Sequence, residues 1–124
     1  MKRSRLKRRS KSKVTIDIAD KSLQNWFRKT YPKGKCEVCN RPFFCMHHFI
    51  PKSQSNFLRF AETNLIFICN SCHFSHHRTG NAKIHAKIII KRGVLWLKKI
   101  MKLSIIKRQA FSKKELEQII KRYE

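Results

Sequence analysis

Two pairs of cysteines have the spacing of a metal-binding knuckle. Cys36 and Cys39 enclose two residues, and Cys69 and Cys72 repeat this spacing about 30 residues later. Four thiolates on two such turns can converge on one tetrahedral Zn²⁺, and they leave no coordination position open for a substrate. We therefore predict a closed structural zinc site that stabilises a small domain. The alternative, four buried free thiols, has to explain why both pairs share one spacing.

Five histidines fall within 31 residues around these cysteines. His73 and His77 are four residues apart, so on a helix they share one face and can hold one ion. His76 is an alternative to His77, because residues three apart share a helix face too. His47 and His48 end an apolar run, and adjacent strand residues point to opposite faces unless the strand twists or ends. A proline three residues later permits such an end.

Short elements must position these residues. The runs FFCMHHFI (43–50) and NLIFIC (64–69) are apolar and bounded by turn residues, which predicts two strands. The connection over 51–63 is long and polar, as functional loops often are. After the second strand the pattern is helical to about residue 78, where a Gly-Asn pair ends it. The cysteines and histidines are therefore expected on two strands, one helix and the turns beside them.

The segment before the first cysteine pair has two parts. Residues 1–13 carry eight basic side chains and no acidic one, so this stretch cannot bury itself and is expected to be a disordered arm. Asp20 could then cap a helix, since apolar residues from Leu23 to Phe27 recur at helical spacing and the pattern ends near Pro32. The arm could contact DNA or serve only as a solubilising or localisation tail.

The segment after residue 80 is predicted to be helical and basic. Residues 82–92 and 94–103 indicate two helices around a glycine, although the isoleucine run also permits a strand. Ser112 and Glu115 fit the capping box of a final helix. We predict an α+β fold with a small zinc-stabilised ββα core and flanking basic helices. Three segments are expected: the arm over 1–16, the core over 17–80 and a helical extension over 81–124.

The charge of the chain points to a polyanionic partner. Thirty Lys and Arg residues against seven Asp and Glu give a formal net charge of +23, and no acidic residue occurs between Thr63 and Lys114. No apolar run approaches the roughly 20 residues of a membrane span, so nucleic acid is expected rather than a membrane. The candidate phosphate contacts are Lys52, Arg59, Arg78 and the arm residues Arg3, Arg5, Arg8 and Arg9; solvated surface charge is the alternative for each.

The start of the chain bears on the cellular compartment of the protein, and the fifth cysteine belongs to neither of the two pairs. The first 13 residues contain no apolar stretch after their charges, so they do not have the pattern of a secretory signal. We therefore expect a cytoplasmic protein, in whose reducing surroundings Cys-x-x-Cys pairs more often bind metal than form disulfides. Cys45 lies in an apolar run and is expected to be a core residue.

The order of these motifs resembles the HNH nucleases, whose ββα core binds one metal ion. The residues that carry the resemblance are the histidine pair at the end of the first strand, Asn64 before the second strand, and the histidines of the following helix. The resemblance implies that His48 is the general base and that Asn64 orients it. It also implies that His47, His73 and His77 are the ligands of the catalytic metal.

The implied reaction suits these residue types. Hydrolysis of a phosphodiester needs a base poised near neutral pH to activate water, and histidine meets this requirement. It also needs a cation that stabilises the phosphate and the leaving 3′ oxygen. We expect one catalytic divalent cation, Mg²⁺ or Mn²⁺ with Zn²⁺ as the alternative, in addition to the structural Zn²⁺.

A second resemblance covers roughly residues 36–124. The segments LRFAETN, CNSC, TGN and SKKELEQIIKRY are similar in order and spacing to the phage recombination endonucleases of the NinG or Rap family. It implies cleavage of branched DNA, such as Holliday junctions or flaps, by a protein encoded by a phage or mobile element and acting in the bacterial cytoplasm. Because the chain has more of the HNH histidines than that family commonly has, the resemblance supports cleavage better than it supports branched-DNA specificity.

Three other functions stay open. The first alternative is a non-catalytic zinc module that binds nucleic acid, although such a module has no use for His48 and Asn64. The others are an HNH nuclease of a DNA-packaging system and one of a homing system. A homodimer is one option, because resolving a four-way junction needs two cuts.

Overall fold

The structure is a computed structural model that describes residues 11–42, 45–79 and 82–124. The chain forms two compact units. One contains the described residues up to Trp26 together with Phe111–Glu124, and the other contains Phe27–Ala110. Both cysteine pairs and the histidines lie in the second unit. None of the helices in the described part of the chain is long and apolar enough to span a membrane.

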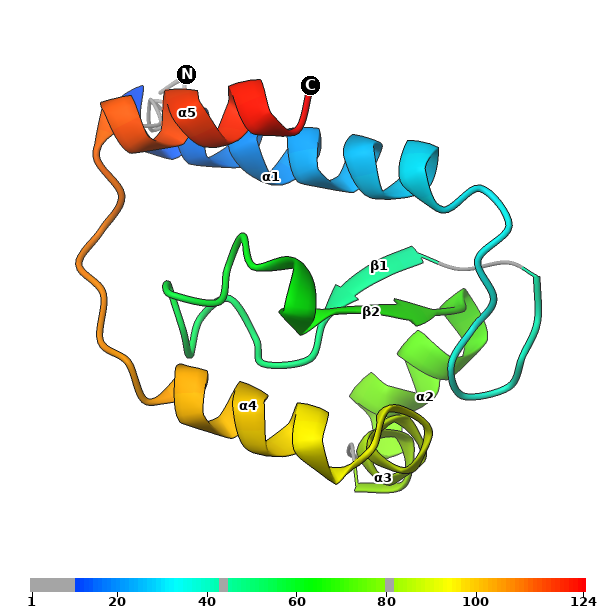
Figure 1. The fold of residues 1–124 in the computed structure, drawn as a ribbon. Helices are drawn as coiled ribbons and strands as arrows, with labels where there is room; N and C mark the ends of the chain where they lie inside the picture. The colour runs from blue at the N-terminus through cyan, green and yellow to red at the C-terminus, as the bar shows by residue number, and fades with distance from the viewer. Residues whose placement is uncertain (1–10, 43–44, 80–81) are drawn as a thin grey trace, which may run out of the picture. The chain divides into compact units, whose positions relative to one another are not determined.

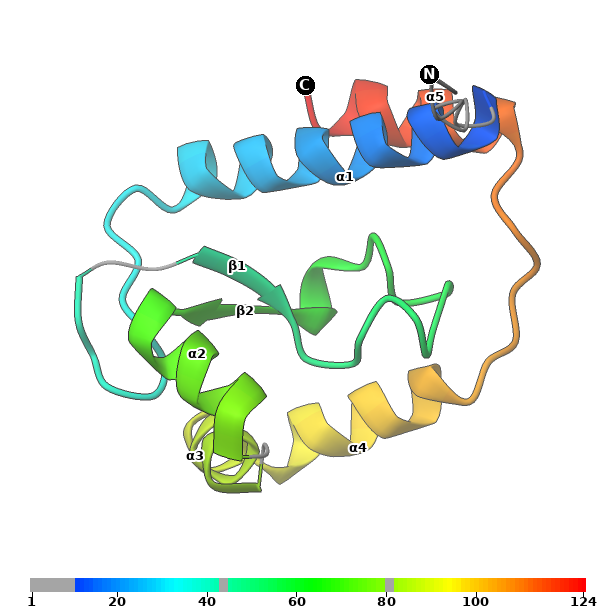
Figure 2. The same cartoon turned by 180° about the vertical axis from the view of Figure 1, so that it is seen from behind.

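The first unit pairs two helices. The first sixteen residues of helix α1 (Lys11–Thr30) belong to this unit. Helix α5 (Lys113–Arg122) lies beside this part of α1 in both views (Figures 1 and 2). The rings of Trp26 and Tyr123 meet with their centroids 5.0 Å apart. The Ser112 side chain accepts a hydrogen bond from the Glu115 N–H, and the Glu115 side chain accepts one from the Ser112 N–H. The predicted capping box is confirmed.

The start of the first helix was predicted wrongly. Asp20 does not cap α1 but lies inside it, because the helix begins at Lys11. Six residues that we had assigned to the disordered arm are therefore helical. The apolar pattern gives the reason, since Ile16 and Ala19 continue the helical stripe of Leu23 upstream of Asp20. The arm residues 1–10, with their four arginines, lie outside the described residues.

The sheet of the second unit has the two predicted strands. Strands β1 (Cys45–His48) and β2 (Leu65–Ile68) pair antiparallel, with Cys45 opposite Ile68 and His48 opposite Leu65. The chain between them makes turns and the short helix η1 (Glu62–Asn64), so the long connection is confirmed. The structure has the predicted α+β class, with one two-stranded sheet and five α-helices in the described segments.

The two faces of this sheet have different neighbours. Ile66 and Ile68 are buried in a core with the helix residues Ile84, Ile88 and Ile100. The residue between them, Phe67, alternates to the other face, and its ring lies 4.7 Å from that of Phe27. Strand β2 is therefore covered on both sides within this unit.

Three helices complete the second unit. They are α2 (Asn70–Thr79), α3 (Ala82–Arg92) and α4 (Val94–Ser104), so the helical reading of the isoleucine run was right. Figure 1 shows α3 nearly end-on while α4 runs across the view, which means that the chain turns sharply at Gly93. Gly93 has φ +95° and ψ 164°, a backbone conformation that is essentially restricted to glycine.

Candidate functional site

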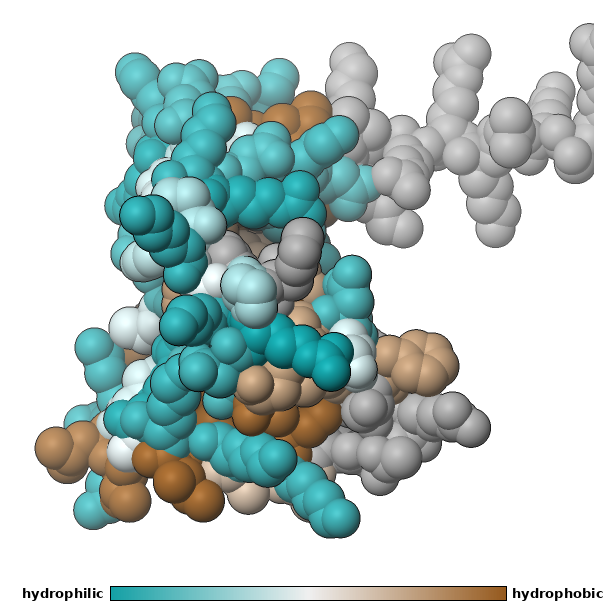
Figure 3. Space-filling view, turned by 90° about the vertical axis from the view of Figure 1, so that its right-hand side faces the viewer, coloured by the Kyte–Doolittle hydropathy of each residue, from teal (hydrophilic) through white to brown (hydrophobic). Residues whose placement is uncertain are grey.

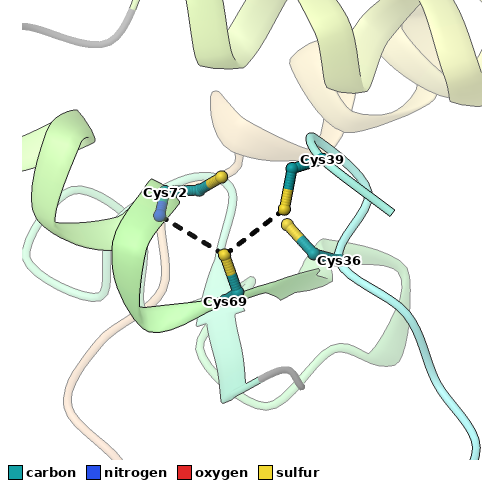
Figure 4. A group of neighbouring side chains, drawn as sticks. All are labelled: Cys36, Cys39, Cys69 and Cys72. Atoms are coloured by element: carbon teal, nitrogen blue, oxygen red, sulfur yellow. Dashed lines mark hydrogen bonds between the residues drawn. The ribbon is translucent and has the colours of Figure 1, made fainter. Parts of the chain in front are cut away.

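The four paired cysteines converge, as predicted. Their sulfur atoms all lie within 4.8 Å of one another, and Cys39 Sγ lies 3.5 Å from Cys69 Sγ. Figure 4 shows the side chains pointing toward one another, two from the turn after α1 and two from the end of β2 and the first turn of α2. Cys36 and Cys69 are buried, whereas Cys39 is exposed.

These distances fit zinc. Four Zn–S bonds of about 2.3 Å in a tetrahedron place the sulfur atoms about 3.8 Å apart, which falls between the 3.5 Å from Cys39 Sγ to Cys69 Sγ and the 4.8 Å that bounds all the sulfur separations. Two backbone groups support the sulfurs, since the Val38 N–H donates to Cys36 Sγ and the Cys72 N–H donates to Cys69 Sγ, each at 3.4 Å. Such N–H groups stabilise thiolates. The cluster therefore has the donors and the spacing of a closed metal site.

The pKa values of these thiols diverge. Burial opposes ionisation of Cys36, but backbone hydrogen bonds from Cys39, Cys69 and Val38 outweigh it and lower its pKa to about 7. Burial and the neighbouring thiols raise the pKa of Cys72. Four crowded thiolates repel one another without a cation between them. Metal binding must therefore expel protons from this cluster.

Cys45 takes no part in the cluster. Its Sγ donates to the Ile68 carbonyl oxygen at 3.1 Å, and its side chain packs against the core. Burial raises the pKa of this thiol, as expected for a thiol among apolar side chains. The prediction of a core residue is confirmed.

His47 and His73 are brought together by the pairing of the sheet with α2. Their ring centroids are 4.8 Å apart and the rings are inclined at 70°. His47 comes from β1 and His73 from the first half of α2, one residue after the second cysteine pair. His76, His77 and Arg78 lie on the last turns of α2, but their side chains are outside the described part. The choice between His76 and His77 as a ligand stays a prediction.

His48 is buried and held by the loop that follows β1. Its Nε2 lies 2.7 Å from the Arg59 carbonyl oxygen. Because a carbonyl oxygen can only accept, Nε2 carries the hydrogen and the lone pair of a neutral ring is on Nδ1. The loop therefore selects one tautomer of His48.

Asn64 is fully buried and binds the same loop through its amide. Its Oδ1 accepts from the Ile50 N–H at 2.8 Å, and its Nδ2 donates to the carbonyl oxygens of Ile50 at 3.0 Å and Leu58 at 3.3 Å. These contacts join the start of the loop to its second half, and Leu58 precedes the residue whose carbonyl holds His48. The amide thus bonds to loop backbone, where we had expected it to orient the histidine ring.

The sequence reasoning missed an ion pair beside the cysteine cluster. Arg92 at the end of α3 donates from Nε to Glu37 Oε1 at 2.6 Å and from Nη2 to Glu37 Oε2 at 3.0 Å. Nη2 also donates to the Leu65 carbonyl oxygen, and the Glu37 carboxylate accepts from the Phe67 N–H. The only sequence feature that could have indicated this ion pair is an acidic residue between two cysteines of a very basic chain.

This ion pair protects the outer edge of β2. The edge strand has backbone groups that β1 does not reach, and unpaired edges are unfavourable. The Glu37 N–H donates to the Phe67 carbonyl oxygen, so both backbone groups of Phe67 and the carbonyl of Leu65 are bonded. Leu65 lies opposite His48 in the sheet. The pair therefore connects the first cysteine turn and α3 to the strand beside His48.

We expect Arg92→Met to destabilise the second unit by about 3–5 kcal/mol, because it leaves the buried Glu37 carboxylate without its cation. The Glu37 side chain is only 7% exposed, so little solvent screens its charge. Thermal unfolding of the zinc-loaded protein measures the effect. Lys91→Met is the control, since Lys91 is exposed on the same helix. Equal stability of the two variants would show that the ion pair contributes little.

The candidate phosphate contacts are only partly described. Lys52 is exposed in the loop after β1, and the Arg59 guanidinium lies 5.8 Å from the centroid of the Phe60 ring. The arm residues and the Arg78 side chain lie outside the described part of the chain. These assignments stay predictions.

Comparison with known proteins identifies the segment that holds these groups. The family model described as HNH endonuclease matches residues 36–79. This range contains both cysteine pairs, both strands and α2 with its histidines. No curated protein and no solved structure matches the chain. The HNH resemblance of this segment is therefore confirmed, whereas the resemblance to the NinG or Rap family gains no support.

Proposed function

We propose that residues 36–79 form an HNH nuclease domain that hydrolyses phosphodiester bonds of DNA with one catalytic cation. The observation that carries the proposal is the approach of His47 and His73, two imidazoles from β1 and α2, beside a cysteine cluster that fits a structural ion. The family match over the same residues supports a nuclease in general.

The catalytic cation is assigned to His47, His73 and His77. Three imidazoles are nitrogen donors, which suit transition-metal ions better than Mg²⁺. We therefore place Mn²⁺ and Zn²⁺ ahead of Mg²⁺ among the expected ions. A cation bound there would stabilise the negative charge of the phosphate and of the leaving 3′ oxygen.

His48 is assigned the proton transfer. Its hydrogen bond to the Arg59 carbonyl supports a ring with Nδ1 as the proton acceptor, and His48 takes the proton of the attacking water at that atom. Asn64 acts through the loop, because its amide bonds to the backbone of Ile50 and Leu58, and the residue after Leu58 supplies the carbonyl that orients His48. This makes Asn64 a positioning residue.

DNA is held by phosphate contacts in this proposal. Lys52 and Arg59 lie on the loop that follows the strand of the histidine pair, and Arg78 and the arm arginines add positive charge. Branched DNA is the finer proposal for the substrate, and it rests on the sequence resemblance alone. A higher cleavage rate on four-way junctions or flaps than on plain duplex would support it.

The cation assignment predicts a specific variant phenotype. His73→Ala removes one imidazole ligand, and even the loss of a group that only supports a ligand lowers metal affinity about 10–100-fold. The cation concentration for half-maximal cleavage should therefore rise by at least this factor, while excess cation restores part of the rate. His85→Ala is the matched control, because its ring lies on α3 and packs against Phe49 with centroids 4.7 Å apart. Cleavage rates over a cation titration give the answer. Identical curves for His73→Ala and the wild type would remove His73 from the site.

A further inference from the structure

The outward faces of α3 and α4 carry lysines around an apolar corner. On α3, Lys83, Lys87 and Lys91 recur every four residues, so they form a row along one face, and all three are exposed. On α4, Lys98 and Lys102 repeat the same spacing and are also exposed. No acidic residue occurs in either helix or anywhere between Thr63 and Lys114. Both rows therefore lack a counter-charge in their own segment.

Three large apolar side chains stand at the corner between the two rows. Ile90 is 81% exposed, Val94 is 61% exposed and Leu95 is 83% exposed. Gly93 turns the chain between α3 and α4 at this place, and the buried side chains of the two helices, such as Ile88 and Ile100, face the core instead. Figure 3 shows apolar side chains projecting among hydrophilic ones at the lower edge of the molecule. We call Ile90, Val94 and Leu95 the apolar ridge.

We propose that the two lysine rows and the apolar ridge form a second DNA-contacting surface, in which the lysines hold phosphates and the ridge enters the minor groove of a duplex. This surface rests on the proposed function, because a nuclease domain makes DNA the expected polyanion. Lysines bind phosphate without regard to sequence, and exposed Leu and Ile side chains can wedge between base steps and unstack them.

Other occupants fit the surface less well. A second copy of the chain would bring the same lysines together without acidic partners, so their charges would repel. An amphipathic helix at a lipid surface needs a continuous apolar face. On α4 the side chains of Trp96, Leu97 and Ile100 pack into the core, and Lys98 and Lys102 interrupt the outward face. A DNA duplex can bind to this surface through the lysine rows and the apolar ridge alone, without an acidic partner or a continuous apolar face.

Binding of a labelled duplex of about 20 base pairs tests the lysine rows. The full chain, loaded with one Zn²⁺ per molecule for its cysteine cluster, is titrated at several salt concentrations without any further divalent cation, so that binding is read without cleavage. The variant K83Q/K87Q/K91Q should lower the slope of log affinity against log salt by about 2–3, since each phosphate contact contributes about 0.9. The control K29Q/K33Q/K35Q removes the same charge from exposed positions outside the surface and should change the slope by less than about 1.

Leu95→Ser tests the ridge on the same duplex with 2-aminopurine at a TA step. Wild-type protein should raise the fluorescence as the step unstacks, whereas Leu95→Ser should lose this rise and keep the salt slope. Because Leu95 is largely exposed, the substitution should leave thermal unfolding unchanged.

Equal slopes for the two lysine variants, or an unaltered fluorescence rise with Leu95→Ser, would overturn the proposal. So would variants that lose binding to phosphatidylserine vesicles and keep binding to DNA. DNA that is bound but stays uncut after the catalytic cation is added would contradict the nuclease and leave this surface standing.

Discussion

Replacing His48 by alanine is expected to slow DNA cleavage by about 10²–10⁴-fold, the usual contribution of a general base. The side chain is buried, and its Nε2 is held at 2.7 Å from the Arg59 carbonyl oxygen, so the ring has a fixed tautomer and position. It is assigned neither to metal nor to phosphate. Zinc content and DNA affinity should therefore stay close to those of the wild type, and single-turnover cleavage with excess protein measures the chemical step.

His48→Gln separates the loss of the base from the loss of the contact. The glutamine amide can still donate to the Arg59 carbonyl, but it cannot take a proton near neutral pH. We expect it to be as slow as His48→Ala and more stable to heat. If either variant cut DNA at the wild-type rate, His48 would not be the base.

Loss of the structural metal is expected to unfold the second unit. A structural Zn²⁺ contributes about 10–16 kcal/mol, which equals or exceeds the whole stability of an ordinary domain. Cys72→Ser removes one of the four converging ligands and should abolish both zinc retention and helical circular dichroism from this unit. Cys45→Ser is the matched control, because this thiol is outside the cluster and a serine hydroxyl can also donate to the Ile68 carbonyl.

Zinc binding at the same site should make the stability of the second unit depend on pH. The thiols must lose their protons to bind zinc, so zinc depresses their pKa values in the folded protein, and the stability it provides is lost as the pH falls. Even Cys36, whose pKa in the metal-free cluster is lowered to about 7, becomes protonated below neutral pH without metal. Zinc release and unfolding should therefore coincide on acidification. A Cys72→Ser protein with normal zinc content and thermal stability would contradict the assignment.

Local patterns were enough to predict the elements that hold the site. The apolar runs and turn residues around β1 and β2 and the Ser112 capping box depend on neighbouring residues, and each predicted element is present in the structure. The convergence of the four cysteines was also predictable, because zinc ligation imposes a recognisable spacing.

Contacts between distant residues could not be read from the sequence. Glu37 and Arg92 are 55 positions apart, and nothing in either local segment indicates that they form a bidentate pair. The contacts of Asn64 could not be predicted without knowing the path of the loop, because its amide bonds to backbone groups that residues of any type could supply. The start of α1 was missed for another reason: a dense run of positive charge obscured an apolar stripe that continues into it.

The most direct measurement is single-turnover cleavage by the folded, zinc-loaded chain as a function of added cation. Labelled duplex, flap and four-way junction DNA are incubated with excess protein and a titration of Mn²⁺, Mg²⁺ or Zn²⁺, and circular dichroism and zinc content are recorded for the same sample. We predict cleavage of at least one of these substrates, with a rate that rises and saturates with one of the cations. DNA that stays intact at every concentration of every cation, in protein that binds it and retains its zinc, would contradict the nuclease assignment and favour a DNA-binding zinc module.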